Sequence, residues 1–203
     1  MSVDPIRRRD AMLLTIGFEG GLSLLALGLG WLLGQPPLGK IHWSPRDFGL
    51  GIAATLPMLL GFAICVRWPV GPLARIKRFS EEFIRPFFRP CTWYDLAAIS
   101  IVAGIGEEAL FRGVFQGAVG HWLGTGYGLA IASILFGLLH LITPTYALLA
   151  AACGAYLGGL LLLTDNLLVA ILPHALYDFV ALTYLVNGPA PKAAELAAGP
   201  PEL

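Results

Sequence analysis

Six ionisable side chains lie within strongly apolar parts of this sequence. In chain order they are Glu107, Glu108, Arg112, His140, His174 and Asp178. A charged side chain at the centre of a bilayer costs at least about 2.5 kcal/mol on insertion scales, so such groups usually mark a functional site. Carboxylates and imidazoles can also exchange protons or bind divalent ions. The set therefore indicates a site for proton transfer or ion binding at membrane depth.

The spacing within the first group predicts different roles for its two glutamates. Glu108 and Arg112 are four residues apart, so on a helix they share a face and can form a buried ion pair. Glu107 is rotated by about 100° and lacks that partner in its own helix. A carboxylate clamped by arginine stays ionised and structural, whereas one in a poorly solvated cavity can accept a proton near neutral pH.

The two histidines follow a similar helical spacing. His140 comes one turn after Phe136, and His174 comes one turn before Asp178. A carboxylate at that distance can orient an imidazole or complete a metal site. A lone histidine is more often a satisfied core residue, but helices packed in one bundle can bring these groups to a single pocket. We therefore expect the histidines and carboxylates to converge.

The composition indicates that this pocket lies in a membrane protein. Of the 203 residues, 57% are hydrophobic and 13% are charged, and the mean hydropathy is +0.74, which is outside the usual range of water-soluble domains. We expect an all-α fold, a polytopic membrane helix bundle. The net charge of zero provides no basic field for nucleic acid. Cys65, Cys91 and Cys153 lack a metal-binding spacing and are expected to be unpaired.

Apolar segments of sufficient length predict about six transmembrane helices. They cover residues 11–33, 48–66, 93–116, 127–142, 146–163 and 167–186. The expected regions are a cytoplasmic N-terminus (1–10), two N-terminal transmembrane helices (11–66), a basic amphipathic segment (67–92), a four-helix core (93–186) and a disordered tail (187–203).

Charge indicates how these regions are oriented. The positive-inside rule places residues 7–9 and the basic segment in the cytoplasm, with the protein in the plasma (inner) membrane. The basic segment alternates Arg and Lys with Phe and Ile, a pattern typical of an interfacial helix that contacts membrane lipids, although a solvated connector is the alternative.

The three polar groups resemble the motifs of the CAAX prenyl endopeptidase-like intramembrane proteases, also called the CPBP or abortive-infection-type family. Glu-Glu-x-x-x-Arg corresponds to residues 107–112, Phe-x-x-x-His to residues 136–140, and His-x-x-x-Asn/Asp to residues 174–178. The resemblance covers about residues 93–186 and agrees in the order and separation of the motifs.

This resemblance implies an endopeptidase that hydrolyses a peptide bond of a membrane-associated or lipidated protein substrate. Glu107 would be the general base, assisted by His140, and would activate the attacking water. His174 and Asp178 would face the tetrahedral oxyanion. The pair that would hold the first motif in shape is Glu108 and Arg112.

The sequence leaves the role of Asp178 and of a metal open. Eukaryotic prenyl endopeptidases have Asn at this position, and an ionised aspartate cannot donate a hydrogen bond to an oxyanion. Asp178 must therefore be protonated, orient His174 or bind a metal, and we expect orientation. No metal ligand is assigned, since His-Glu-x-x-His is absent. If zinc takes part, its donors would be His140, His174, Glu107 and Asp178.

A second class of function also fits the buried charges. The protein could be a non-proteolytic transporter or scaffold that uses the polar cluster to bind ions or protons. Glu19, in the first apolar segment, could line the same cavity, pair with a neighbouring helix or be merely packed and protonated. Gly-x-x-x-Gly patterns at residues 17–21, 113–117 and 154–158 predict close helix contacts, within one chain or in a dimer. The oligomeric state therefore stays open.

Overall fold

The computed structural model describes residues 6–188, which are helical and contain no strand, so the predicted all-α class is confirmed. The elements are α1 (Arg8–Leu33), α2 (Pro45–Arg67), α3 (Pro72–Phe79), η1 (Ser80–Ile84), α4 (Arg85–Phe88), α5 (Trp93–Glu108), η2 (Ala109–Gln116), α6 (Gly117–Leu123), α7 (Thr125–Leu139), α8 (Pro144–Thr164) and α9 (Leu168–Asn187). Elements η1 and η2 are π-helical. The expected tail lies outside the described residues from position 189 onward.

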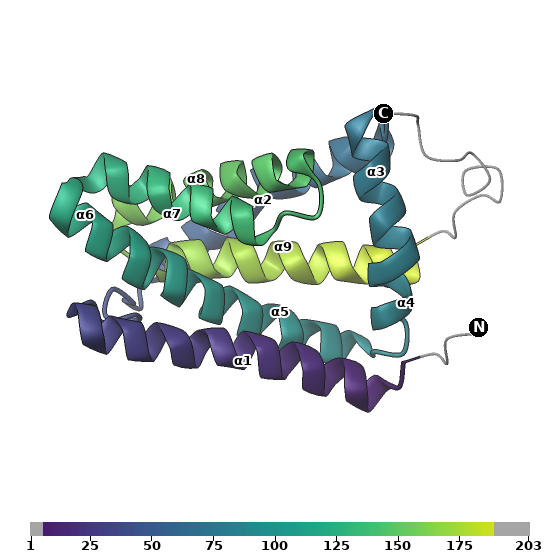
Figure 1. Ribbon diagram of the computed structural model, residues 1–203, viewed down its shortest axis with the longest axis horizontal. Helices are drawn as coiled ribbons and strands as arrows, with labels where there is room; N and C mark the ends of the chain where they lie inside the picture. Colours follow the sequence, from purple (N-terminus) through teal and green to yellow (C-terminus); the bar gives the residue numbers. More distant parts are fainter. Residues whose placement is uncertain (1–5, 189–203) are drawn as a thin grey trace.

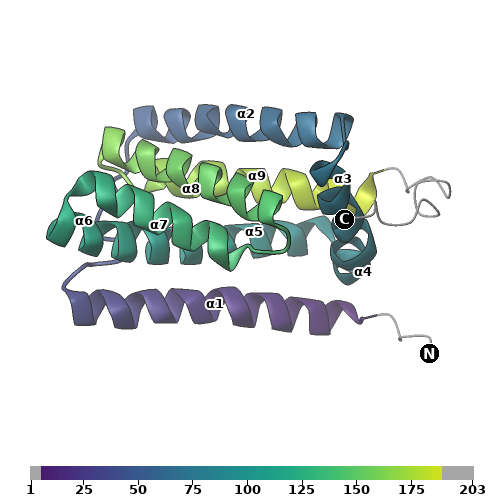
Figure 2. The same ribbon diagram turned by 45° about the horizontal axis from the view of Figure 1, so that its top comes forward.

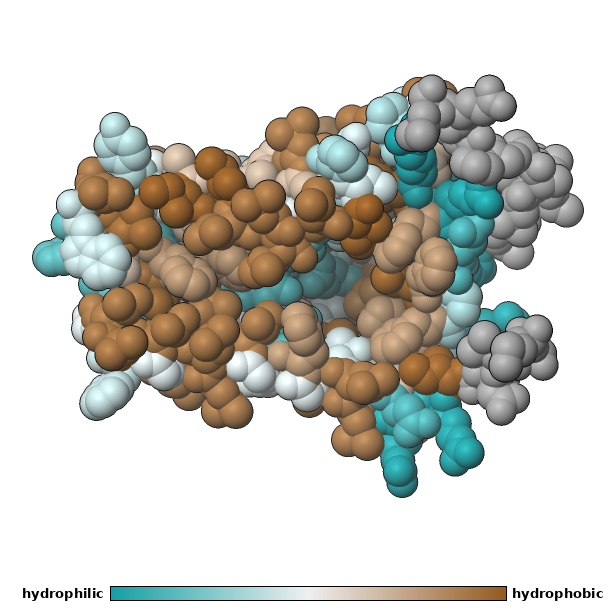
Figure 3. Space-filling view, viewed as in Figure 1, coloured by the Kyte–Doolittle hydropathy of each residue, from teal (hydrophilic) through white to brown (hydrophobic). Residues whose placement is uncertain are grey.

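Four of these helices, α1, α2, α8 and α9, are long and apolar enough to cross a membrane. Large apolar side chains point away from the bundle, and Trp31 and Leu163 are each 85% exposed. Figure 3 shows apolar side chains covering most of one face of the molecule. Such a surface suits lipid rather than water. The chain is therefore an integral membrane protein.

The predicted boundaries near the third and fourth apolar segments need correction. The helix that begins at Trp93 continues through η2 and α6 to Leu123, beyond the predicted end at residue 116. The next helix, α7, runs from Thr125 to Leu139, whereas the sequence predicted residues 127–142. Gly124, with a φ of 102°, makes the turn between α6 and α7 because glycine tolerates positive φ. His140 therefore follows the end of α7.

The long helices run along a common axis (Figures 1 and 2). In Figure 2, α1 and α2 lie at opposite edges of the bundle, and the other long helices lie between them. Helix α1 packs on α5, α5 packs on α9, α9 packs on α2, and α7 packs on α8. The first and last described residues lie at the same end of the bundle, where α3 and α4 run across it (Figure 1).

Both ends of α1 are fixed to the segment formed by α5, η2 and α6. Arg8 donates two hydrogen bonds, of 2.6 and 2.8 Å, to the carboxylate of Asp95 at the start of α5. Just beyond the other end of α1, the carbonyl oxygen of Pro37 packs against Gly113, where a side chain would collide with it. These contacts hold α1 along the helix that carries the two adjacent glutamates.

The small-residue patterns divide into two kinds. A β-carbon added at Gly154 would lie 3.1 Å from Arg112 Nη2, and one at Gly158 would collide with Gln116 Oε1. These glycines are therefore used in packing within the chain. Gly17 and Gly21, in contrast, have no atom within 4 Å of a β-carbon position in the described part of the chain.

Candidate active site

The six polar residues singled out in the sequence come together where α5, η2, the end of α7 and α9 meet. Glu107 Oε2 lies 3.9 Å from His140 Nε2 and 4.0 Å from His174 Nε2. Both distances are too long for direct hydrogen bonds. Glu107 Oε2 is buried and has no hydrogen-bond partner among the described residues. The expected convergence of these three residues is therefore present, with one carboxylate oxygen between two imidazoles.

Glu108 lies beside Glu107 in the sequence but has very different surroundings. Its Oε1 accepts a hydrogen bond of 2.9 Å from Arg112 Nη1 and lies 2.7 Å from His174 Nδ1. Glu108 is 0% exposed and Arg112 is 1% exposed. The ion pair expected from the four-residue spacing is present. The bond to His174 was not predicted, because it joins helices that are distant in the sequence and no local rule signals it.

The π-helical segment η2 directs two polar side chains toward the backbone of α8. Arg112 Nη2 donates to the carbonyl of Gly154, and Gln116 Nε2 donates to the carbonyl of Gly158, each at 3.1 Å. The two donors are four residues apart in the sequence, and so are the two acceptors. The same contact is therefore made twice between η2 and α8. Side chains at the two glycines would fill the space that Arg112 and Gln116 occupy. The glycines are therefore needed for the buried arginine to reach α8.

Phe136 positions His140 through both its backbone and its ring. Its carbonyl oxygen lies 2.8 Å from His140 Nδ1, and the two rings stack with centroids 4.5 Å apart. The Phe136 ring also makes a cation–π contact with Arg112, whose Cζ atom lies 4.4 Å from the ring centroid. A carbonyl only accepts hydrogen bonds, so Nδ1 carries the hydrogen. In the neutral ring, Nε2 is then a free acceptor facing Glu107.

His174 has a carboxylate oxygen near each ring nitrogen. Nδ1 lies 2.7 Å from Glu108 Oε1, and Nε2 lies 3.4 Å from Asp178 Oδ2. The ring therefore has acceptors for two N–H groups. The sequence assigned the orientation of His174 to Asp178 alone, whereas Glu108 makes the shorter contact.

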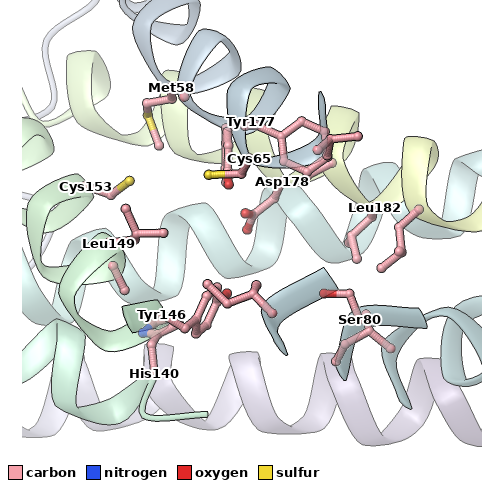
Figure 4. A pocket seen from close by; sticks show the side chains of 18 of the residues that line it. Met58, Cys65, Ser80, His140, Tyr146, Leu149, Cys153, Tyr177, Asp178 and Leu182 are labelled. Atoms are coloured by element: carbon pink, nitrogen blue, oxygen red, sulfur yellow. The ribbon is translucent and has the colours of Figure 1, made fainter. Parts of the chain in front are cut away.

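A cavity of about 790 Å³ adjoins this cluster, and His140, His174 and Asp178 are among the residues that line it. Figure 4 shows Asp178 directed into the cavity from α9, with His140 and Tyr146 facing it. The rest of the wall is largely apolar and comes from α2, α3, η1, α4, α8 and α9. Figure 3 shows a hollow with hydrophilic atoms in an otherwise apolar face.

The basic segment predicted at residues 67–92 contributes part of the cavity wall. Its α3 places Ile76, its η1 places Ser80 and Ile84, and its α4 places Phe88 along the cavity. The sequence indicated only an amphipathic segment, and its position at the membrane interface stays a prediction. Tyr146, whose ring centroid lies 6.1 Å from that of His140, was also missed, because no motif marks it. The first finding depends on contacts between helices that are distant in the sequence, and the second on the turn that joins α7 to α8.

The donor geometry does not fit a metal centre. Among residues 6–188, no group of three or more His, Cys, Asp or Glu side chains is arranged to hold a metal ion. The Nδ1 atom of His174 is already occupied by Glu108. The side chains considered for zinc from the sequence therefore do not form a zinc site in this arrangement.

Comparison with protein families identifies one match. Residues 89–180 match the family model described as type II CAAX prenyl endopeptidase Rce1-like. No curated protein and no solved structure matches the chain. The matched range contains every residue from Glu107 to Asp178 and leaves α1 and α2 outside it.

Proposed function

Because residues 89–180 are an Rce1-like domain of the type II CAAX prenyl endopeptidase family, we propose that this protein is an intramembrane endopeptidase. The family expected from the three motifs is thereby confirmed for this part of the chain. The proposed reaction is hydrolysis of a peptide bond in a membrane-associated or lipidated substrate. The observation that carries it is the position of Glu107 Oε2 about 4 Å from both imidazoles, beside a cavity.

In this mechanism Glu107 and His140 together bind the attacking water. Their facing atoms are 3.9 Å apart, a separation that one bridging water spans. The water donates one hydrogen to Glu107 Oε2 and the other to His140 Nε2, and its oxygen lone pair points at the scissile carbonyl. As the new C–O bond forms, Glu107 takes the proton and then delivers it to the amide nitrogen while the C–N bond breaks. Such general base catalysis contributes about 10²- to 10⁴-fold.

His174 is the proposed donor to the tetrahedral oxyanion. In this role the ring is the imidazolium form, with a hydrogen on each nitrogen, and its Nδ1–H donates to Glu108, which fixes the plane of the ring. Its Nε2–H lies near Asp178 at the cavity wall, where it can donate to the carbonyl oxygen as negative charge develops. Donors held in place before the reaction stabilise such charge most effectively. Asp178 acts as an acceptor that keeps Nε2–H directed toward the cavity.

We also propose that the chain crosses the membrane six times, with both ends of the described chain in the cytoplasm. The helical segments run along one axis, and the first and last described residues lie at one end of the bundle (Figure 1). The arginines at positions 7–9 and the basic helices α3 and α4 belong to that same end. By the positive-inside rule this end faces the cytoplasm, in the plasma (inner) membrane.

The substrate proposed for this site is a peptide or prenylated protein that reaches the cavity from the membrane or the cytoplasmic end. The largely apolar cavity wall suits a lipid chain or apolar side chains. Basic residues on α3, among them Arg75 and Arg78, could attract an anionic substrate or lipid headgroups.

The direct test is cleavage of a membrane-associated peptide by the purified protein in lipid, followed by mass spectrometry of the products. Glu107→Ala should abolish cleavage and leave the helical circular dichroism signal unchanged. Asp165→Asn, at an exposed carboxylate paired with Lys40, is the matched control and should retain activity. Cleavage by Glu107→Ala at the wild-type rate would rule out the proposed base, and pH-linked transport without cleavage would favour the transporter alternative.

A further inference from the structure

Glu19 is a buried carboxyl group on α1, outside the Rce1-like domain. Its side chain belongs to an apolar helix, and the residue is only 8% exposed. Its Oε2 atom is buried and has no hydrogen-bond partner among the described residues, as is also true of Glu107 Oε2. Buried polar atoms nearly always have a partner in native proteins. Glu108 Oε2 is a third such oxygen, but Glu108 already has partners through Oε1. The pair that needs a common explanation is therefore Glu19 and Glu107.

A close approach of α1 to α5 brings Glu19 to the level of Glu107. Gly106 directly precedes Glu107, and a β-carbon at Gly106 would lie 2.9 Å from the carbonyl oxygen of Glu19 and 2.7 Å from Ser23 Oγ. The two helix backbones therefore pack directly on one another at this position. The Arg8 to Asp95 ion pair and the Pro37 contact keep the helices together toward both ends.

The charged groups around Glu19 are those of the proposed active site. Its carboxyl group is close enough to interact electrostatically with Glu107 on α5 and with His174 and Asp178 on α9. Two carboxylates in a poorly solvated interior repel one another, so such a pair tends to share a proton. A shared proton also gives both unpartnered oxygens a hydrogen-bond partner.

We propose that Glu19 is a positioning residue for the hydrolytic reaction, and this inference rests on the proposed function. Its protonated carboxyl group donates a hydrogen bond to Glu107, directly or through one water molecule. That bond holds the Glu107 carboxylate in the orientation in which Oε2 faces His140. Glu19 keeps its own proton throughout, while Glu107 takes a proton from the attacking water and passes it to the leaving amine. The active site thus includes a residue from a helix outside the matched domain.

The test compares Glu19→Leu and Glu19→Gln with the wild-type protein in lipid, using kcat, KM, thermal stability and the pH profile. Leucine fills a similar volume without a hydrogen-bond donor. We expect Glu19→Leu to lower kcat about 10- to 100-fold, because misplacement of a reacting group has effects of that size. KM should equal that of the wild type, and the melting temperature should be equal or higher. Glu19→Met provides the same comparison if the leucine variant does not fold.

Glutamine supplies an N–H donor that does not titrate, so Glu19→Gln should stay within about threefold of wild type at neutral pH, where a hydrogen bond is replaced by a similar one. At alkaline pH the wild-type rate should fall as Glu19 loses its proton, and the glutamine variant should not show this fall. Ser23→Ala, one turn away on the same face of α1, is the matched control and should keep the wild-type profile.

Two results would overturn the role of Glu19. One is a wild-type kcat in Glu19→Leu, and the other is a folded Glu19→Gln that is as slow as Glu19→Leu at every pH. Both differ from failure of the proposed function, which would appear as no cleavage by the wild-type protein or full cleavage by Glu107→Ala.

Discussion

The polar centre has two sides that differ in how firmly their charged groups are held by hydrogen bonds. On the paired side, Glu108 and Arg112 are 0% and 1% exposed and bond to each other, to His174 and to the backbone of α8. On the open side, Glu107 Oε2 has no partner among the described residues, and the side chain of Asp178 is 30% exposed at the cavity. Glu108 Oε2 is likewise without a partner among the described residues, but Glu108 is held in the fold through Oε1. Glu107 Oε2 instead faces the two imidazoles and remains available to react.

His174 joins the two sides through its two ring nitrogens. Nδ1 contacts Glu108 on the paired side, and Nε2 lies 3.4 Å from Asp178 on the open side. Adjacent glutamates fall on different sides because successive helix positions are rotated by about 100°. The comparison therefore predicts that changes on the open side affect the rate, and that changes on the paired side affect stability first.

The largest expected effect is on the open side, in Glu107→Gln. This change removes the proton acceptor but keeps the size of the side chain. We expect kcat to fall by about 10²- to 10⁴-fold, with no loss of thermal stability, because a buried carboxylate is replaced by a neutral amide. Peptide cleavage and a melting curve of the same preparation measure both quantities. A fall in kcat of less than tenfold would mean that another group is the base.

The next largest effect is expected on the paired side, in Arg112→Met. Removing one partner of a buried ion pair typically costs about 3–5 kcal/mol, and in this variant the buried Glu108 carboxylate keeps only its contact with His174. Thermal unfolding in detergent should show this loss. The double variant with Glu108→Leu should recover much of the stability, because apolar residues replace both charges, yet it should stay slow because His174 loses its Nδ1 partner. A double variant no more stable than Arg112→Met would show that the pair is not the source of the stability.

The sequence predicted the helical elements and the contacts within one helix better than the contacts between helices. Hydropathy located the apolar helices, and four-residue spacing predicted the ion pair of Glu108 with Arg112, because both depend on local periodicity. The bond from Glu108 to His174 joins residues 66 positions apart, so no local pattern indicates it. The approach of Glu19 to Glu107 likewise depends on packing at Gly106. The roles assigned to the individual site residues stay predictions until the variants are measured.

A smaller effect is expected where α8 packs on the paired side. At Gly158 a new β-carbon would lie 2.6 Å from Leu129 Cδ1 and would collide with Gln116, whereas at Gly159 nothing lies within 4 Å of it in the described chain. Gly158→Ala should therefore destabilise the fold by about 1–3 kcal/mol through overpacking. Gly159→Ala is the matched control and should be neutral or stabilising by up to about 1 kcal/mol, since alanine favours the helix. Equal melting temperatures for the two variants would contradict the close packing of η2 on α8.

The smallest effect is expected from Asp178→Asn, which tests how the open side directs His174. The amide oxygen of asparagine can still accept a hydrogen bond from Nε2–H, so the orientation of the ring is retained. A neutral acceptor binds more weakly than a charged one by about 1 kcal/mol, and we expect kcat to fall by about fivefold. Asp178→Ala, which has no acceptor, should be slower than Asp178→Asn in the same cleavage assay. If asparagine and alanine reduce kcat equally, Asp178 acts through its negative charge, and orientation of His174 is the wrong explanation for its place beside the cavity.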